Sequence, residues 1–137
     1  MFSKIMVPID LRHTDKMEKA LDVAAGMARQ HGASVTYVGV TSSQPSSIAH
    51  TPEEFKKKLA AFAEQSGKAH GFVADARSYV SHDPAVDLDD TLLKAIKEIG
   101  ADLVVMQSHV PGLQEYLWPS NGGAVATHAE VSVVIVR

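Results

Sequence analysis

Two spacings of apolar residues alternate along this chain, one typical of strands and one typical of helices. Short apolar runs predict strands at residues 4–10, 33–41, 74–81, 103–106 and 131–137. The runs at 4–10 and 103–106 hold consecutive apolar residues, which is typical of strands buried on both faces of a sheet.

Apolar residues at intervals of three or four predict the helices. They recur in residues 17–30 and again in residues 88–99, which Gly100 follows. Thr51, followed by Pro52 and two glutamates, predicts the start of another helix that runs to about Gln65. A short helix is expected to open after residues 118–123.

The links between these elements carry cap and turn residues. Thr14 or Asp15 is expected to cap the first helix. His82-Asp83-Pro84 is expected to form a turn. Residues 42–51 are polar and contain a proline, which predicts a loop with freedom to move.

The predicted order alternates strands and helices from one end to the other. Such alternation predicts a single domain, residues 1–137, in which helices cover both faces of a parallel sheet. Ligands of such sheets bind beyond the carboxyl ends of the strands, where the direction of winding switches. The loops after the first strand (residues 10–14) and after the fourth (residues 107–112) are therefore the candidate sites.

The composition restricts the kinds of partner and chemistry. The chain has 137 residues, a net charge of −3 and no cysteine. This charge gives no reason to expect nucleic acid or an anionic membrane as a partner. The lack of cysteine excludes disulfides, thiolate metal sites and cysteine nucleophiles. No apolar run reaches the ~20 residues of a membrane span, and no signal-peptide layout is visible, so a cytoplasmic location is expected.

Hydrogen-bond donors gather near the end of the chain. The fourth predicted strand runs into Gln107, Ser108 and His109, and Ser120 with Asn121 opens the last short helix. Donors placed at a strand end and a helix start are typical of an anion or phosphate site. Ser120 and Asn121 suit a helix cap equally well, and His109 also suits a structural role in the loop. No two histidines have the i, i+4 spacing of a helical metal site, so no metal site is expected.

The whole chain resembles the universal stress protein family. Val7-Pro8-Ile9-Asp10 is similar to its opening strand, and residues 101–106 followed by Ser108-His109 are similar to its fourth strand and loop. Residues 120–121 and 128–137 are similar to its closing segment. Residues 116–121 and the terminal Arg137 resemble one bacterial branch, the F/G-type stress proteins.

The resemblance implies both a fold and a ligand. The fold is a three-layer α/β/α domain with a five-stranded parallel sheet in the order 3-2-1-4-5, Rossmann-like and of the adenine nucleotide alpha hydrolase type. The function is that of a stress-response regulator that binds ATP or another adenine nucleotide, with or without Mg²⁺. Carried over by position, the site residues are Pro8, Ile9, Asp10, Val40, Gln107, Ser108, His109, Ser120 and Asn121.

Departures from the family's motif leave a second function open. Gln107 and Val110 replace loop glycines, and Pro119 replaces the last glycine and has no N–H to donate. In this alternative, the nucleotide site is degenerate and the chain is a dimeric interaction module. Arg12 offers a compensating contact, because it follows Asp10 at the top of the first strand, within reach of a phosphate. Slow ATP hydrolysis is the most catalysis expected, because no phosphate-binding Walker loop or nucleophile elbow is present.

The last predicted strand points to assembly. Residues 131–137 include Val131, Val133, Ile135 and Val136, and an apolar strand at a sheet edge needs cover. The resemblance implies that this strand pairs with its copy in a homodimer, or in a tetramer built from such pairs. A regulatory protein partner is also expected, and the sequence does not identify it.

Overall fold

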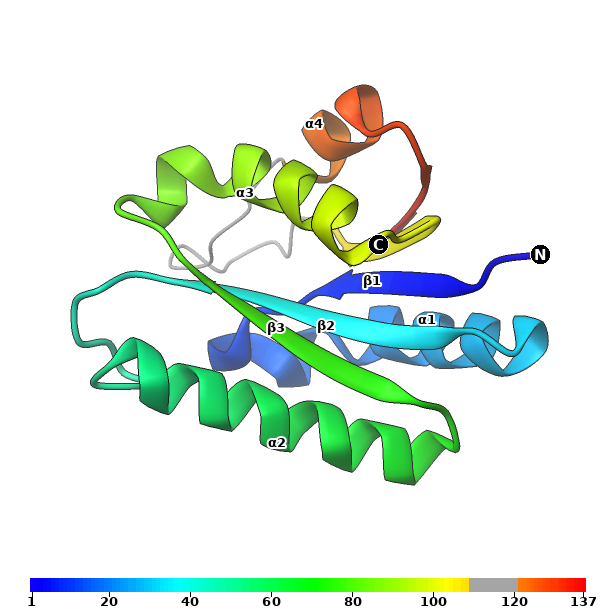
Figure 1. The fold of residues 1–137 in the computed structure, drawn as a ribbon, viewed down its shortest axis with the longest axis horizontal. Helices are drawn as coiled ribbons and strands as arrows, with labels where there is room; N and C mark the ends of the chain where they lie inside the picture. Colours follow the sequence, from blue (N-terminus) through cyan, green and yellow to red (C-terminus); the bar gives the residue numbers. More distant parts are fainter. Residues whose placement is uncertain (109–120) are drawn as a thin grey trace.

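A parallel sheet lies between two layers of helices in the computed structural model, which describes residues 1–108 and 121–137 (Figure 1). In chain order the elements are β1 (Lys4–Pro8), the 3₁₀ helix η1 (Leu11–Lys16), α1 (Glu18–His31), β2 (Ser34–Thr41), α2 (Pro52–His70), β3 (Ala74–Val80), α3 (Pro84–Ile99), β4 (Leu103–Gln107), α4 (Asn121–His128) and β5 (Ser132–Val136). The strands are parallel in the order β3-β2-β1-β4-β5, so the predicted fold class is confirmed.

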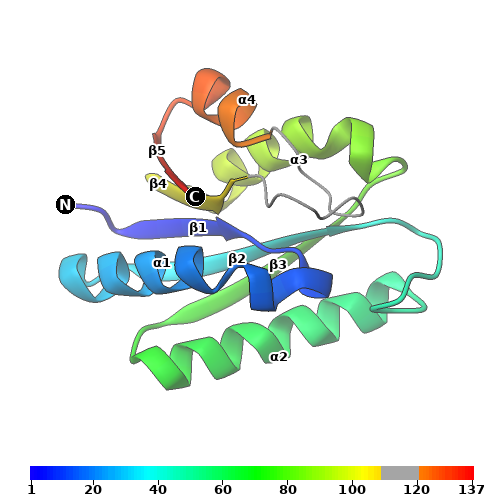
Figure 2. The same cartoon turned by 180° about the vertical axis from the view of Figure 1, so that it is seen from behind.

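Helices α1 and α2 cover one face of the sheet, and α3 and α4 cover the other (Figures 1 and 2). The ring of Tyr37 in β2 meets the ring of Phe62 in α2 edge-on, with centroids 5.2 Å apart. Gly39 is two residues further along β2, so a side chain at position 39 would lie on the same face as Tyr37. A Cβ at Gly39 would lie 2.7 Å from Cζ of Phe55, so the start of α2 approaches the sheet this closely only because residue 39 is glycine.

Strand β1 is the centre of the core. Ile5, Met6 and Val7 are completely buried, and successive side chains point to opposite faces of the sheet. In the ladder, Ile5 stands opposite Val35 of β2 on one side and Leu103 of β4 on the other. Strand β1 is therefore covered on both edges and both faces, as the apolar run predicted.

The start of the first helix differs from the prediction. Residues 11–16 form η1, and the residue that caps α1 is Met17, which makes no side-chain cap bond. The expectation that Thr14 or Asp15 caps α1 is wrong, because both lie inside η1. The backbone carbonyl of Thr14 instead accepts a hydrogen bond from the N–H of Met17 at 3.1 Å.

The second helix starts where predicted and ends later. The hydroxyl of Thr51 accepts a hydrogen bond from the N–H of Glu54 at 3.1 Å, as a helix cap does. The helix then continues to His70 and ends at Gly71, whose φ of 75° is left-handed, so the prediction of an end near Gln65 is wrong. Gly67 lies in the last turns, where a Cβ would be 2.9 Å from the carbonyl oxygen of Phe72. Tertiary packing of α2 on β3 thus outweighs the low helix propensity of glycine.

The third helix begins earlier than its apolar pattern indicated. Pro84 is its first residue, whereas it was expected to belong to the preceding turn, so that expectation is wrong at this residue. Proline fits the first helical position because the N–H it lacks has no partner there. The turn is confined to His82 and Asp83.

Among the described residues no helix combines the length and apolarity needed to cross a bilayer.

The carboxylate of Asp102 fixes the beginning of β1. It accepts hydrogen bonds from the backbone N–H groups of Ser3 at 2.9 Å and Lys4 at 3.0 Å, and from the Ser3 hydroxyl at 3.2 Å. Burial by itself would raise the pKa of Asp102, but these hydrogen bonds outweigh it and hold the pKa below its ordinary value. The start of β1 is therefore anchored to the residue that precedes β4.

We expect the Asp102 contacts to make stability depend on acid pH. Because the pKa of Asp102 is lower in the folded state, its ionised form stabilises the fold at pH values above the ordinary aspartate pKa of about 3.9. This stabilisation is lost as the pH falls through the pKa of the folded state. Asp102→Asn is expected to cost about 1 kcal/mol near pH 7, and this difference should shrink below pH ~4. Urea unfolding of both proteins from pH 7 to pH 2.5 measures it. Asp75→Asn, at an exposed carboxylate, is the control, and a pH-independent difference for Asp102→Asn would contradict the explanation.

Candidate functional site

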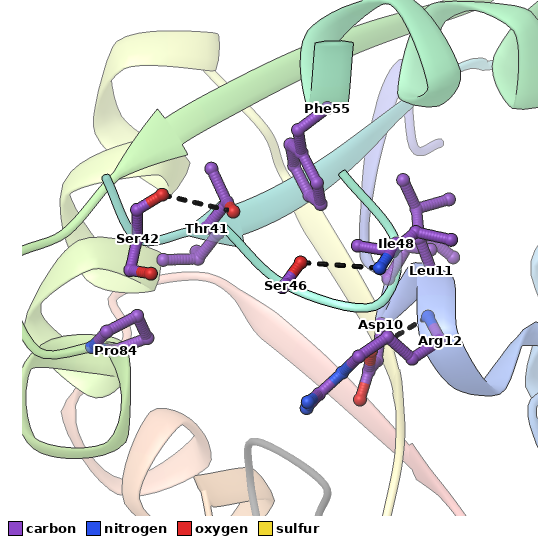
Figure 3. A pocket seen from close by; sticks show the side chains of 11 residues that line it. Asp10, Leu11, Arg12, Thr41, Ser42, Ser46, Ile48, Phe55 and Pro84 are labelled. Atoms are coloured by element: carbon purple, nitrogen blue, oxygen red, sulfur yellow. Dashed lines mark hydrogen bonds and ion pairs between the residues drawn. The ribbon is translucent and has the colours of Figure 1, made fainter. Parts of the chain in front are cut away.

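A small cavity lies at the carboxyl ends of β1 and β2, close to where the sheet changes its direction of winding (Figure 3). Its volume is about 90 Å³. The residues that line it come from the end of β1 and η1, the end of β2, the loop that follows β2, and the first turns of α2 and α3. They are Ile9, Asp10, Leu11, Arg12, Val40, Thr41, Ser42, Ser46, Ile48, Phe55 and Pro84.

The carboxylate of Asp10 is the most buried charged group of this cavity, with 5% of the residue exposed. One of its oxygens accepts from the backbone N–H of Arg12 at 3.0 Å and from Nε of the same residue at 3.4 Å. The other oxygen is 3.0 Å from Nδ1 of His13, which must carry the proton because a carboxylate only accepts. Asp10 is therefore held by two basic side chains from its own turn.

These contacts explain why η1 forms after β1. The side chain of Asp10 caps η1 by accepting from the N–H of Arg12, in the way that aspartate caps a helix. The turn then brings Arg12 and His13 back over the carboxylate, with their side chains only 26% and 20% exposed. The local sequence Asp-Leu-Arg-His thus places a guanidinium at the rim of the cavity.

The loop between β2 and α2, residues 42–50, covers the cavity. Ser46 and Ile48 of this loop line the cavity, and Ile48 is drawn next to Leu11 (Figure 3). The hydroxyl of Ser46 accepts from the N–H groups of Ile48 and Ala49, both at 3.3 Å. Ala49 is only 5% exposed and anchors the loop in the core. The β2–α2 loop is therefore an ordered cover.

Helix α2 holds the end of this loop. Nζ of Lys58 donates to the backbone carbonyl of Ile48 and lies 3.3 Å from Oε1 of Glu54. The other oxygen of Glu54 accepts from the N–H of His50 at 3.1 Å. The hydrogen bond from His50, with the nearby Lys58 ammonium, lowers the pKa of Glu54. One ion pair on the first turns of α2 thus contacts the loop at both Ile48 and His50.

The structure brings together four of the residues predicted for the site. Ile9, Asp10, Arg12 and Val40 all line the cavity. Pro8 directly precedes them as the last residue of β1 but is not among the lining residues.

The residues after β4 are placed differently. Gln107 is 7% exposed, its Oε1 has no partner in the part of the chain that the structure describes, and it is not among the residues of the cavity. By alternation with Leu103, which is level with Ile5, its side chain lies on the face that α1 covers. The N–H of Ser108 donates to the carbonyl of Val136 at 2.7 Å.

The remaining predicted residues lie at the start of α4 or outside the described residues. His109 and Ser120 lie outside the described residues, as do Val110 and Pro119. Asn121 is the first residue of α4. Phosphate binding by these residues therefore stays a prediction.

Sequence reasoning did not identify the residues that close the cavity. Phe55, Ser46, Ile48 and Pro84 line it without having been predicted. The strong helix-start signal at Thr51 did place Phe55 in the first turn of α2. Phe55 could therefore have been predicted as a lining residue of the cavity. No local signal marks Ile48, because a single isoleucine in a polar loop has no periodicity.

The arrangement combines an apolar wall with charged groups at its rim. Ile9, Val40, Ile48 and Phe55 offer surface suited to a flat apolar ring, and Arg12 offers donors suited to an anion. In residues 1–108 and 121–137 no three histidine, aspartate or glutamate side chains are placed to share a metal ion. This combination of an apolar wall and a charged rim is typical of sites that bind a small ligand.

Comparisons with known proteins agree with this fold. The sequence model of a family described as the universal stress protein family matches residues 1–137. Universal stress protein G of Shigella flexneri is 28% identical over 143 residues, with 100% of both chains covered. The universal stress protein from Archaeoglobus fulgidus in complex with dAMP has a TM-score of 0.69 and 20% identity, and 98% of each chain is covered. A universal stress protein family protein from Arabidopsis thaliana with AMP bound has a TM-score of 0.65 and 17% identity, covering 98% of this chain and 90% of that one.

We expect Asp10→Asn to loosen the turn that follows β1. An asparagine oxygen can still accept from the N–H of Arg12, but it offers no charge to the guanidinium or to His13. The expected loss of unfolding free energy is about 1–2 kcal/mol, measured by urea denaturation at pH 7. Asp15→Asn, at an exposed aspartate of the same 3₁₀ helix, serves as the matched control. Equal stability of the two variants would show that the cluster does not support η1.

Proposed function

Since this chain belongs to the universal stress protein family, we propose that it is a regulatory protein of the stress response that binds an adenine nucleotide, ATP above all. One observation carries the proposal: Ile9, Asp10, Arg12 and Val40 meet around a cavity at the carboxyl ends of the central strands. Ligands of open parallel sheets bind at such an edge. The relatives solved with dAMP and with AMP support the adenine part of the proposal.

The base would lie against the apolar wall, and the phosphates would extend toward Arg12. Ile9, Val40 and Phe55 supply the wall. A guanidinium is suited to phosphate because its planar set of N–H groups matches two oxygens at once. The phosphate site would be completed by Ser108, and by His109, Ser120 and Asn121 as the resemblance implies. With Mg²⁺ bound to the phosphates, Arg12 would share the neutralisation of their charge.

A second function is favoured by the state of Asp10. Its carboxylate already accepts from Arg12 and His13, so an amino group of a base would compete with them. Gln107 also carries a side chain where the family motif has glycine. If the site does not bind nucleotide, the chain is a dimeric interaction module that acts by contact with a protein partner. In either case we place it in the cytoplasm and assign it no catalysis beyond slow ATP hydrolysis.

Calorimetric titration of dialysed, phosphate-free protein with ATP, ADP and AMP tests the proposal, each with and without Mg²⁺. Micromolar binding that strengthens with the number of phosphates is expected. Arg12→Ala should weaken ATP by roughly ten-fold or more and AMP by less, because hydrogen bonds to charged groups contribute about 1.5–3 kcal/mol.

Arg29→Ala is the matched control for the loss of a positive charge. Arg29 lies near the end of α1, at the opposite end of the sheet from the cavity. Its removal should leave all three affinities unchanged. Equal affinity for ATP and AMP in the unaltered protein would restrict the site to adenosine, and no binding at all would favour the interaction module.

We also propose that the chain forms a homodimer through β5, with a tetramer as the larger assembly. Within the described sheet β5 pairs only with β4, and Ile135 is 36% exposed. The carbonyl of Val136 accepts from Ser108 on the β4 side, so the backbone groups of Ile135 point to the other edge. No described strand pairs with that edge, so we propose that it pairs with the same strand of a second copy.

Ile135→Pro should separate such a dimer without breaking the sheet. Proline removes only an N–H that points away from β4, and sheets tolerate proline at such edge positions. Light scattering after size-exclusion chromatography should show a monomer, while circular dichroism stays unchanged. A dimer that persists would contradict pairing through β5.

A further inference from the structure

The cavity is much smaller than the ligand proposed for it. Its volume is about 90 Å³, whereas sites for cofactors and other small ligands usually measure about 300–1,000 Å³. The walls formed by β1 and β2 belong to the buried core, with Ile9 and Val40 1% and 4% exposed. Any widening of the described boundary is therefore easier in its parts outside the sheet, namely η1, the β2–α2 loop and the first turns of α2 and α3.

Of these parts, the β2–α2 loop is the one that contains no helix or strand. Ser46 and Ile48 cover the cavity, and residues 43–47 are all exposed. The hydrogen bonds of Ser46 to Ile48 and Ala49 lie within the loop, so they can move with it. The contacts that fix the loop against α2 are those of Lys58 with Ile48 and of Glu54 with His50.

These contacts are well placed to break and form again. The side chains of Lys58 and Glu54 are 45% and 38% exposed, so water can replace either partner when the contact opens. They lie on successive turns of a helix whose other face is packed on the sheet through Phe55 and Leu59. The helix can thus stay in place while the loop leaves it.

We propose that Lys58 and Glu54 form a latch that holds the β2–α2 loop closed over the cavity, and that this latch must open for an adenine nucleotide to enter. The two are positioning residues, because they act through Ile48 and His50. The proposal rests on the proposed nucleotide site for its ligand, and on the loop contacts alone for its mechanism.

A weaker latch should raise the apparent affinity for nucleotide. When the binding-competent form is a minor fraction of the molecules, the apparent affinity is the affinity of that form multiplied by its fraction. A variant that weakens the closed form raises the fraction of open molecules and so tightens binding. Because water screens this contact, its loss corresponds to a change of only roughly two- to ten-fold, less than for a buried charged hydrogen bond.

Lys58→Met tests the latch, since methionine keeps the apolar part of the side chain and loses the ammonium. Lys57→Met is the matched control: it removes the same charge from an exposed neighbouring position of α2. Amide hydrogen exchange of the nucleotide-free proteins, followed by NMR, reports on the loop. The amides of Ala49 and His50 should exchange about two- to ten-fold faster in Lys58→Met and at the original rate in Lys57→Met.

Calorimetry and stopped-flow binding of ATP and AMP then report on entry. Both nucleotides should bind Lys58→Met about two- to ten-fold more tightly than Lys57→Met, through faster association. Glu54→Gln, which keeps an acceptor for His50 but loses the charge, should shift exchange and affinity in the same direction. Faster exchange with unchanged or weaker binding would overturn the role of the loop in entry.

The two readouts separate failure of the latch from failure of the nucleotide site. Unchanged exchange in both Lys58→Met and Glu54→Gln would overturn the latch, whatever the nucleotide data show. Faster exchange with no binding of any nucleotide to any variant would overturn the nucleotide site and, with it, the gating of nucleotide entry.

Discussion

The position of β1 in the middle of the sheet is the constraint on which the rest of the structure depends. It pairs with β2 on one side and β4 on the other, and its residues are buried on both faces. Its two ends are fixed by carboxylates that act in different ways. Asp102 accepts from the backbone at the start of the strand, and Asp10 caps the 3₁₀ turn at its end. The register of this strand thereby determines where Arg12 and the cavity lie.

Asp10, just after the end of β1, has a structural role and, in the proposed site, a ligand-binding role, and these two roles conflict. Asp10 is satisfied within its own turn, which gives η1 its shape and orients Arg12. A carboxylate satisfied in this way has less to offer a ligand that carries an amino group. In the proposed site a nucleotide would therefore compete with Arg12 and His13 for Asp10, and with Asp10 for Arg12.

The alternation of strands and helices could be predicted from the sequence because it depends on periodicity, whereas the strand order came from the family resemblance. The site could be predicted only in part, because it depends on contacts between distant residues. The apolar runs located every strand, and Thr51 located the start of α2. The end of α2 was predicted too early, since Gly67 is favoured by its close approach to β3 rather than by helix propensity. Asp10 and Val40 were predicted from the family resemblance and Arg12 from its place after Asp10, and the structure puts all three at the cavity. Ile48 was missed, because only the tertiary path of the β2–α2 loop brings it over the cavity.

The sheet order also has a consequence for synthesis of the chain. The first three strands can pair with one another as soon as residue 80 has left the ribosome, because β3, β2 and β1 are neighbours in that order. The other edge of β1 has to wait for β4, which starts at Leu103, and the Asp102 anchor arrives at the same moment. Until then a strand whose Ile5, Met6 and Val7 are fully buried in the folded protein has one uncovered edge. The interval between these two events is when a nascent chain of this topology is most exposed to wrong pairing and has most need of a chaperone.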